Sequence, residues 1–185
     1  MAVPAGLRSL LDVIDWLGRF AGISAALALA TLTLLILGEI VVRLLATYIP
    51  ALPAGIPAAW EVSTYLMGYA FMAGSAMALR AGAHIRVGVL LNQVPAPGRR
   101  LLEIVTTAIA LLLTTFLAYS LIWFSWSAFK YGQTSISSDI PTWIPKAAIA
   151  FGATVLALQV LGRLISAVLG LPLEDERLKG ETIGE

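Results

Sequence analysis

The residues of this chain that could do chemistry are few, and most of them stand at the ends of long apolar runs. Glu39 and Arg43 are four residues apart, a spacing at which a carboxylate and a guanidinium can pair on one helix face. Glu61 follows Trp60 at the start of another run, where the dipole of a helix would favour its negative charge. His84 is the only histidine, which excludes paired histidine ligation of a haem within the chain.

Other catalytic sets are missing from the sequence. The chain has no cysteine, which excludes disulfides, thiolate metal sites and cysteine nucleophiles. The sequence holds no Ser/His/Asp set, no phosphate-binding glycine loop and no cluster of metal ligands. It therefore predicts that the chain is not an enzyme and holds no cofactor or metal ion of its own.

Four long apolar runs must position the charged residues. Uncharged stretches cover residues 20–38, 62–79, 104–129 and 147–162. A helix that crosses a ~30 Å hydrocarbon core needs about 20 mostly apolar residues, and its backbone groups must be satisfied within the segment. The sequence therefore predicts an all-α membrane protein with four transmembrane helices, at about residues 18–42, 60–80, 101–126 and 145–169.

Composition supports one membrane domain without a soluble catalytic part. Hydrophobic residues make up 59% of the chain and charged residues 12%, and the net charge of +1 argues against a nucleic-acid partner. We expect residues 1–172 to form this domain and residues 173–185 to form a mobile cytoplasmic tail.

The basic residues predict an orientation. One side of the membrane would carry nine of them, namely Arg8, Arg19, Arg80, Arg86, Arg99, Arg100, Arg163, Arg177 and Lys179, and the other side only Arg43, Lys130 and Lys146. By the positive-inside rule, both termini and the middle loop are expected in the cytoplasm.

Two shorter segments have amphipathic patterns. Leu7, Leu10, Leu11, Ile14 and Leu17 share one helix face, which predicts either an N-terminal amphipathic helix in the membrane interface or an extension of the first span. Asp15 and Arg19 lie off that face at a pairing distance along the helix. Ile85, Val89 and Leu90 predict a short interfacial helix in the cytoplasmic loop.

Polar residues inside the spans favour structural roles. Gln159 is the one large amide in a span, and a helix–helix hydrogen bond accounts for it. Threonines such as Thr31, Thr33, Thr106 and Thr114 can bond back to carbonyls of their own helix. The small residues Ala70, Gly74, Ala78 and Gly82 recur every four positions, so this face would allow close approach of either a partner helix or another span of this chain.

The second span and the loop after it resemble a known family. The stretch opens with Trp60-Glu61 and closes with Gly82-Ala83-His84-Ile85-Arg86, like the DctQ-like small permease subunit of TRAP (tripartite ATP-independent periplasmic) transporters. Further matches are Arg43, Pro95, Arg99-Arg100 and Pro141-Thr142-Trp143, so that the resemblance covers about residues 43–163. Gly88 departs from the pattern, because an aspartate is often found at that position in the family.

The resemblance implies a subunit of the bacterial inner membrane that takes part in sodium-driven uptake of an organic anion, often a carboxylate. A periplasmic binding protein would capture the substrate, and a large permease subunit of about twelve spans would hold the sodium and substrate sites. The small subunit would then be a scaffold, in contact with lipid and with the large subunit, that helps to dock the binding protein. No residue of this chain is expected to bind the substrate.

The residues expected at the interface with these partners are Arg43, Trp60, Glu61, Ala70, Gly74, Ala78, Gly82 and Trp143. A second set, Arg80, His84 and Arg86, is expected to order the cytoplasmic loop. We also expect Arg43 and Glu61 to pair and so to order the outer rim that meets the binding protein.

Three other functions stay open at this point. A small four-span exporter would use a glutamate of the first span as its proton and substrate site, but Glu39 lies close to the end of that span. A membrane anchor for a redox enzyme is disfavoured by the single histidine. The sequence is also compatible with an orphan four-helix membrane assembly factor.

Overall fold

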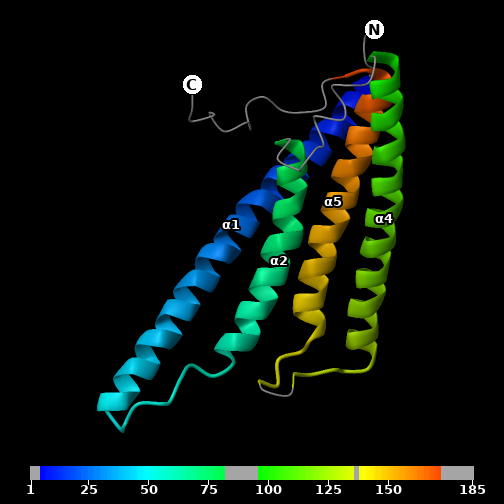
Figure 1. Cartoon of the computed structure of the whole chain (residues 1–185). Coiled ribbons are helices and arrows are strands. Elements are labelled where there is room, and N and C mark those ends of the chain that lie inside the picture. Colours follow the sequence, from blue (N-terminus) through cyan, green and yellow to red (C-terminus); the bar gives the residue numbers. More distant parts are fainter. Residues whose placement is uncertain (1–4, 82–95, 136–137, 172–185) are drawn as a thin grey trace, which may run out of the picture.

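Four long α-helices make up most of the chain that the computed structural model describes, which is residues 5–81, 96–135 and 138–171. They are α1 (Ala5–Tyr48), α2 (Ala59–Arg80), α4 (Ala96–Lys130) and α5 (Trp143–Leu169) (Figure 1). All four are long and apolar enough to cross a membrane. The predicted all-α fold with four spanning helices is therefore confirmed, and each predicted span lies inside one of these helices.

Helix α1 is continuous over 44 residues. At 1.5 Å per residue this is about 66 Å, roughly twice the thickness of the hydrocarbon core. No proline interrupts the chain between Pro4 and Pro50, so nothing in the backbone forces the helix to break. The amphipathic N-terminal segment is thus the first part of α1 and not a separate helix, while its position in the membrane interface stays a prediction. The short helix predicted around Ile85 lies outside the described residues.

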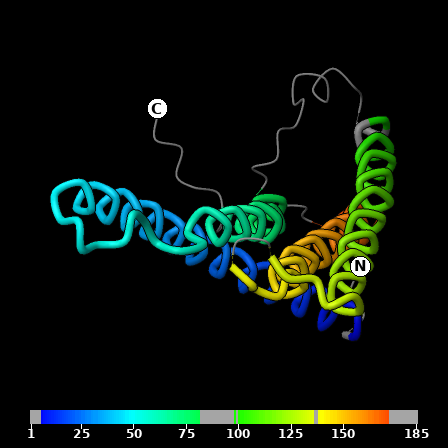
Figure 2. Tube along the Cα trace, turned by 90° about the horizontal axis from the view of Figure 1, so that it is seen from below, coloured from blue at the N-terminus to red at the C-terminus, as the bar shows by residue number. Residues whose placement is uncertain are grey.

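The helices form a single layer in the order α1, α2, α5, α4. The closest neighbours are α1 with α2, α2 with α5, and α5 with α4, while the N-terminal half of α1 also crosses α5. Figure 2, which views the molecule from below, shows this layer as an extended row and not as a closed bundle. Such a layer leaves apolar side chains on both of its faces, which only lipid or other protein can cover.

Successive helices run in opposite directions (Figure 1). We call the end where α1 and α4 begin and α2 and α5 finish the inner end, after the predicted orientation, and the opposite end the outer end. At the outer end the left-handed residue Asp139, with a φ of 51°, turns the chain between α4 and α5. An isolated bridge joins Thr134 to Pro141 in this α4–α5 loop.

The core of the layer consists mainly of alanines. Ala21 and Ala25 of α1, Ala73 and Ala76 of α2, and Val155 of α5 are buried against one another. Small side chains let the three helices approach closely, which is how helices associate where no hydrophobic effect drives them together. This packing brings the polar residues of different helices into contact at both ends of the layer.

Candidate functional site

Ion pairs join neighbouring helices at the inner end. Arg80 at the end of α2 pairs with Asp15 of α1. Arg163 of α5 donates from Nη2 to Oε1 of Glu103 on α4 over 2.9 Å, and the two side chains are only 10% and 19% exposed. Arg100 of α4 donates to the carbonyl of Val168 on α5 over 2.6 Å. Each of these contacts links two different helices.

Gln159 links α5 to α1. Its Nε2 donates to the backbone carbonyl of Ile14 over 2.6 Å, and the residue is only 2% exposed. The amide lies against Gly18, where a Cβ would overlap it, so the glycine makes room for this contact. The helix–helix hydrogen bond predicted for Gln159 is confirmed. Its Oε1 is buried without a hydrogen-bond partner in the described part of the chain.

We call Asp15, Arg80, Glu103, Gln159 and Arg163 the inner polar network. The network connects α2 to α1, α1 to α5, and α5 to α4. The pairing of Asp15 with Arg19 that the spacing allows stays a prediction, while packing of α2 on α1 brings Arg80 to the same carboxylate as an ion-pair partner. Polar groups that hold helices together in a low-dielectric interior are costly to separate. The network therefore fixes the relative positions of the helices.

At the outer end, Glu39 is held by two partners. Its Oε1 accepts a hydrogen bond from Nε of Arg43 over 2.6 Å, and its Oε2 accepts one from the backbone N–H of Ile56 over 2.5 Å. Glu39 is 4% exposed, while the side chain of Arg43 is 57% exposed. A Cβ on Gly55 would lie 2.7 Å from Oε1 of Glu39, so the loop before α2 can close over this carboxylate because that residue is glycine. The predicted pairing of Glu39 with Arg43 is confirmed.

Glu61 joins α2 to the α4–α5 loop. Its Oε1 accepts a hydrogen bond from the Tyr65 hydroxyl, and its Oε2 accepts one from the Ser138 hydroxyl, each over 2.7 Å. The expected pair of Arg43 with Glu61 is therefore wrong. Arg43 bonds to Glu39, one turn earlier on its own helix, and Glu61 accepts a hydrogen bond from Ser138 of the α4–α5 loop. Ser138 could not be found from the sequence, because nothing local marks it as a partner of α2.

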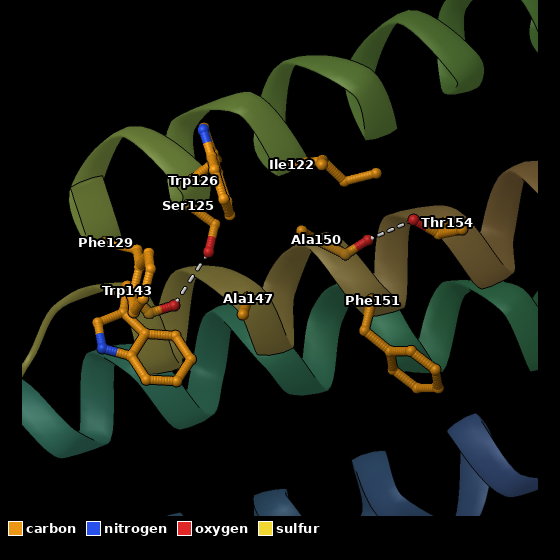
Figure 3. A pocket seen from close by; sticks show the side chains of 9 residues that line it. All are labelled: Ile122, Ser125, Trp126, Phe129, Trp143, Ala147, Ala150, Phe151 and Thr154. Carbon is orange, nitrogen blue, oxygen red and sulfur yellow. Dashed lines mark hydrogen bonds between the residues drawn. The ribbon is translucent and has the colours of Figure 1, made fainter.

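The outer ends of α4 and α5 are joined by polar and aromatic contacts. Ser125 donates to the carbonyl of Trp143 over 3.1 Å, as Figure 3 shows, and the ring of Phe129 meets that of Trp143 edge-on at 5.5 Å. Lys146 donates to Oε1 of Gln133 over 3.0 Å and lies 4.0 Å from the centre of the Phe124 ring. Trp143, one of the residues expected at a partner interface, therefore makes part of its contacts with α4 of its own chain.

The remaining residues expected at an interface have mixed surroundings. Trp60 is 67% exposed. Ala70, Gly74 and Ala78 are half-buried, and a Cβ on Gly74 would lie 3.7 Å from the Cβ of Ala25 on α1. This contact favours internal packing of the stripe at Gly74. Gly82, His84 and Arg86 lie outside the described residues.

Among the described glycines, the one whose added Cβ would meet the backbone of another helix most closely is not part of the predicted stripe. A Cβ on Gly152 of α5 would lie 2.8 Å from the backbone nitrogen of Ala73 and 3.0 Å from the Cβ of Met72 on α2. The buried face of α2 is centred on Ala73 and Ala76, next to the predicted stripe. The small residues Ala148 and Gly152, four positions apart, are the signal that could have indicated this crossing.

Groups of His, Cys, Asp or Glu that could hold a metal ion are not found among residues 5–81, 96–135 and 138–171. The charged side chains named above instead contact one another, the backbone or neighbouring hydroxyls. These contacts hold helices and loops together, and Asp15, Glu39, Glu61 and Glu103 all take part in them.

Comparisons with known proteins agree with this arrangement. The model of the DctQ component of tripartite ATP-independent periplasmic transporters matches residues 32–170. A Haemophilus influenzae protein, named for a small permease role in a TRAP transporter, is 27% identical over 147 residues, which cover 80% of this chain and 84% of that protein. The C4-dicarboxylate TRAP transporter small permease protein DctQ of Rhodobacter capsulatus is 27% identical over 109 residues, 58% of this chain and 48% of that protein. No solved structure matches the chain.

Proposed function

The chain belongs to the DctQ family, the small permease components of tripartite ATP-independent periplasmic (TRAP) transporters, and we propose that it acts as the scaffold of its transporter. It is a multi-pass inner-membrane subunit of a transporter and not an enzyme. In this proposal the large permease subunit, of about twelve spans, holds the sodium and substrate sites. This chain braces the large subunit in the lipid bilayer and carries neither a substrate ligand nor a cofactor.

The observation that carries the proposal is the use of buried polar groups for contacts between helices. Glu103 and Arg163 pair between α4 and α5, and Gln159 bonds the backbone of α1. Ionisable groups within a membrane span are costly, and one without a partner in the protein would point to an ion or substrate path. In this chain the buried groups pair, which supports a structural role over a transport path.

The surroundings of Glu39 argue against the alternative that the chain is a small exporter, in which Glu39 would be the proton site. Both oxygens of Glu39 accept hydrogen bonds, from Arg43 and from the backbone of Ile56. A carboxylate that must bind and release a proton together with a substrate would need access to both, and Glu39 is 4% exposed.

We further propose that the transporter takes up an organic anion of the carboxylate class, driven by sodium. The R. capsulatus relative is named for C4-dicarboxylates, and this name supports the substrate class proposed here. The outer end would help to dock the periplasmic binding protein. The Glu61–Ser138 hydrogen bond supports this role, because it holds the α4–α5 loop against α2 and so gives the outer rim a fixed shape.

Orientation is tested by cysteine labelling, which is clean because the chain has no native cysteine. We expect an impermeant maleimide to label Tyr131→Cys, at the outer end of α4, in intact cells. It should label Ser9→Cys, in the first turns of α1, only after the membrane is opened. Labelling of Ser9→Cys in intact cells would reverse the topology that the nine-to-three distribution of basic residues predicts.

Reconstituted uptake tests the function. Proteoliposomes with the large permease subunit and the binding protein should take up a carboxylate substrate only when this chain is also present. Full uptake by the large subunit without this chain would overturn the scaffold proposal.

A further inference from the structure

A cavity of about 480 Å³, widely open to the surface of the helix layer, lies between the outer halves of α4 and α5 (Figure 3). Its walls are mainly Ile122, Trp126 and Phe129 of α4 together with Ala147, Ala150 and Phe151 of α5. Phe151 also meets Phe20 of α1 edge-on at 6.4 Å, so this lining residue connects α5 to α1. This volume is within the range of sites that hold small molecules in proteins.

The lining selects for an apolar occupant. It contains no charged residue, and its two hydroxyl groups are engaged within the chain: Ser125 donates to the Trp143 carbonyl over 3.1 Å, and Thr154 donates to the Ala150 carbonyl over 2.8 Å (Figure 3). Water needs several polar partners to remain in a cavity, and these walls offer almost none. Hydrocarbon is therefore the chemistry that fits.

The outer mouth of the cavity has features that suit a phospholipid headgroup. Lys130 is four residues after Trp126 and so lies on the same face of α4. Its ammonium lies 5.8 Å from the centre of the Tyr131 ring, and no carboxylate of the described residues is paired with it. Tryptophans such as Trp126 and Trp143 are typical of the headgroup level, and a lysine near the end of a span can extend its ammonium to the level of the lipid phosphates.

We propose that this cavity binds one acyl chain of a phospholipid of the outer leaflet, whose phosphate contacts Lys130. The site goes beyond the scaffold function and does not depend on it. The acyl chain of the lipid lies between the apolar walls of α4 and α5, and its headgroup lies at the level of Trp126 and Trp143. The lipid thereby fills a gap in the α4–α5 contact that the side chains of this layer leave open.

Native mass spectrometry of the purified chain, alone and in complex with the large subunit, tests the site. The probe is dioleoyl phosphatidylglycerol, titrated into mild detergent. Ala147→Trp should fill the cavity and lower the affinity for the first bound lipid about tenfold, a factor that corresponds to 1.4 kcal/mol. Ala30→Trp is the matched control, because Ala30 is exposed on α1 away from the cavity, and it should bind lipid like the unchanged chain.

A second pair of variants tests the headgroup contact without changing the packing. Lys130→Gln should weaken binding of the first lipid several-fold. Lys146→Gln should leave binding unchanged, because the ammonium of Lys146 already contacts Gln133 and Phe124. Unchanged binding in both Ala147→Trp and Lys130→Gln would overturn the proposal. If Ala147→Trp released the large subunit while lipid binding persisted, the cavity would bind that subunit and not a lipid. This result would also overturn the proposal.

Discussion

Replacing Gly152 by alanine is expected to lower the free energy of unfolding of the chain by about 1–3 kcal/mol, the usual effect of an overpacked contact. The added Cβ would lie 2.8 Å from the backbone nitrogen of Ala73, which cannot rotate away as a flexible side chain could. Helix α2 must therefore move away from α5. Thermal unfolding of the purified chain in detergent measures the loss, and co-purification of the large subunit should fall with it.

Gly74→Ala is the matched control for this experiment. Both substitutions add one methyl group to a helix and gain the same helix propensity, but a Cβ on Gly74 lies at an ordinary contact distance of 3.7 Å from the Cβ of Ala25. We expect its thermal midpoint to stay unchanged or to rise slightly. Equal destabilisation by both alanines would mean that the α2–α5 crossing at Gly152 is no tighter than the contact of α2 with α1 at Gly74.

Arg163→Met should have the second large effect. Loss of one partner from a buried ion pair costs about 3–5 kcal/mol in other proteins, because the remaining charge loses its compensation. The side chains of Arg163 and Glu103 are only 10% and 19% exposed, so we expect a value near the lower end of that range. The same thermal unfolding assay in detergent measures it.

Two controls separate burial from charge. Arg43→Met removes an arginine whose side chain is 57% exposed, and the Glu39 carboxylate that it leaves, although only 6% exposed, keeps its hydrogen bond from the backbone N–H of Ile56, so we expect a smaller loss than for Arg163→Met. The double change Glu103→Leu and Arg163→Met should recover most of the stability, because it removes both charges and leaves none uncompensated. If Arg163→Met were as mild as Arg43→Met, the inner polar network would not hold α4 and α5 together.

The helices were predictable because their signal is local. Uncharged runs long enough to cross a bilayer lie inside each helix, and the scarcity of polar groups made the helix–helix bond of Gln159 the natural expectation. The contacts of Thr31, Thr33, Thr106 and Thr114 with carbonyls of their own helices were predictable for the same reason.

The order of the helices in the layer was not predictable, because it depends on contacts between residues far apart in the chain. Spacing along one helix places Arg19 within reach of Asp15, but it does not show that the packing of α2 also brings Arg80 to this carboxylate. Likewise, Gly74 belongs to a clear stripe of small residues, yet the close crossing is made by Gly152, whose importance depends on where Ala73 lies. Composition alone also gave no transporter family, which followed from the motif around Trp60-Glu61 and was confirmed by the family match.

If this chain supports transport without binding substrate or sodium, uptake kinetics of the complete transporter will show it. Proteoliposomes of the complete transporter should be compared with those carrying Gln159→Leu, a change at the buried contact between α5 and α1. We expect the maximal rate to fall in proportion to the amount of assembled complex, while the apparent KM for substrate and for sodium stays the same. A change of tenfold or more in either KM, at an equal amount of complex, would contradict it.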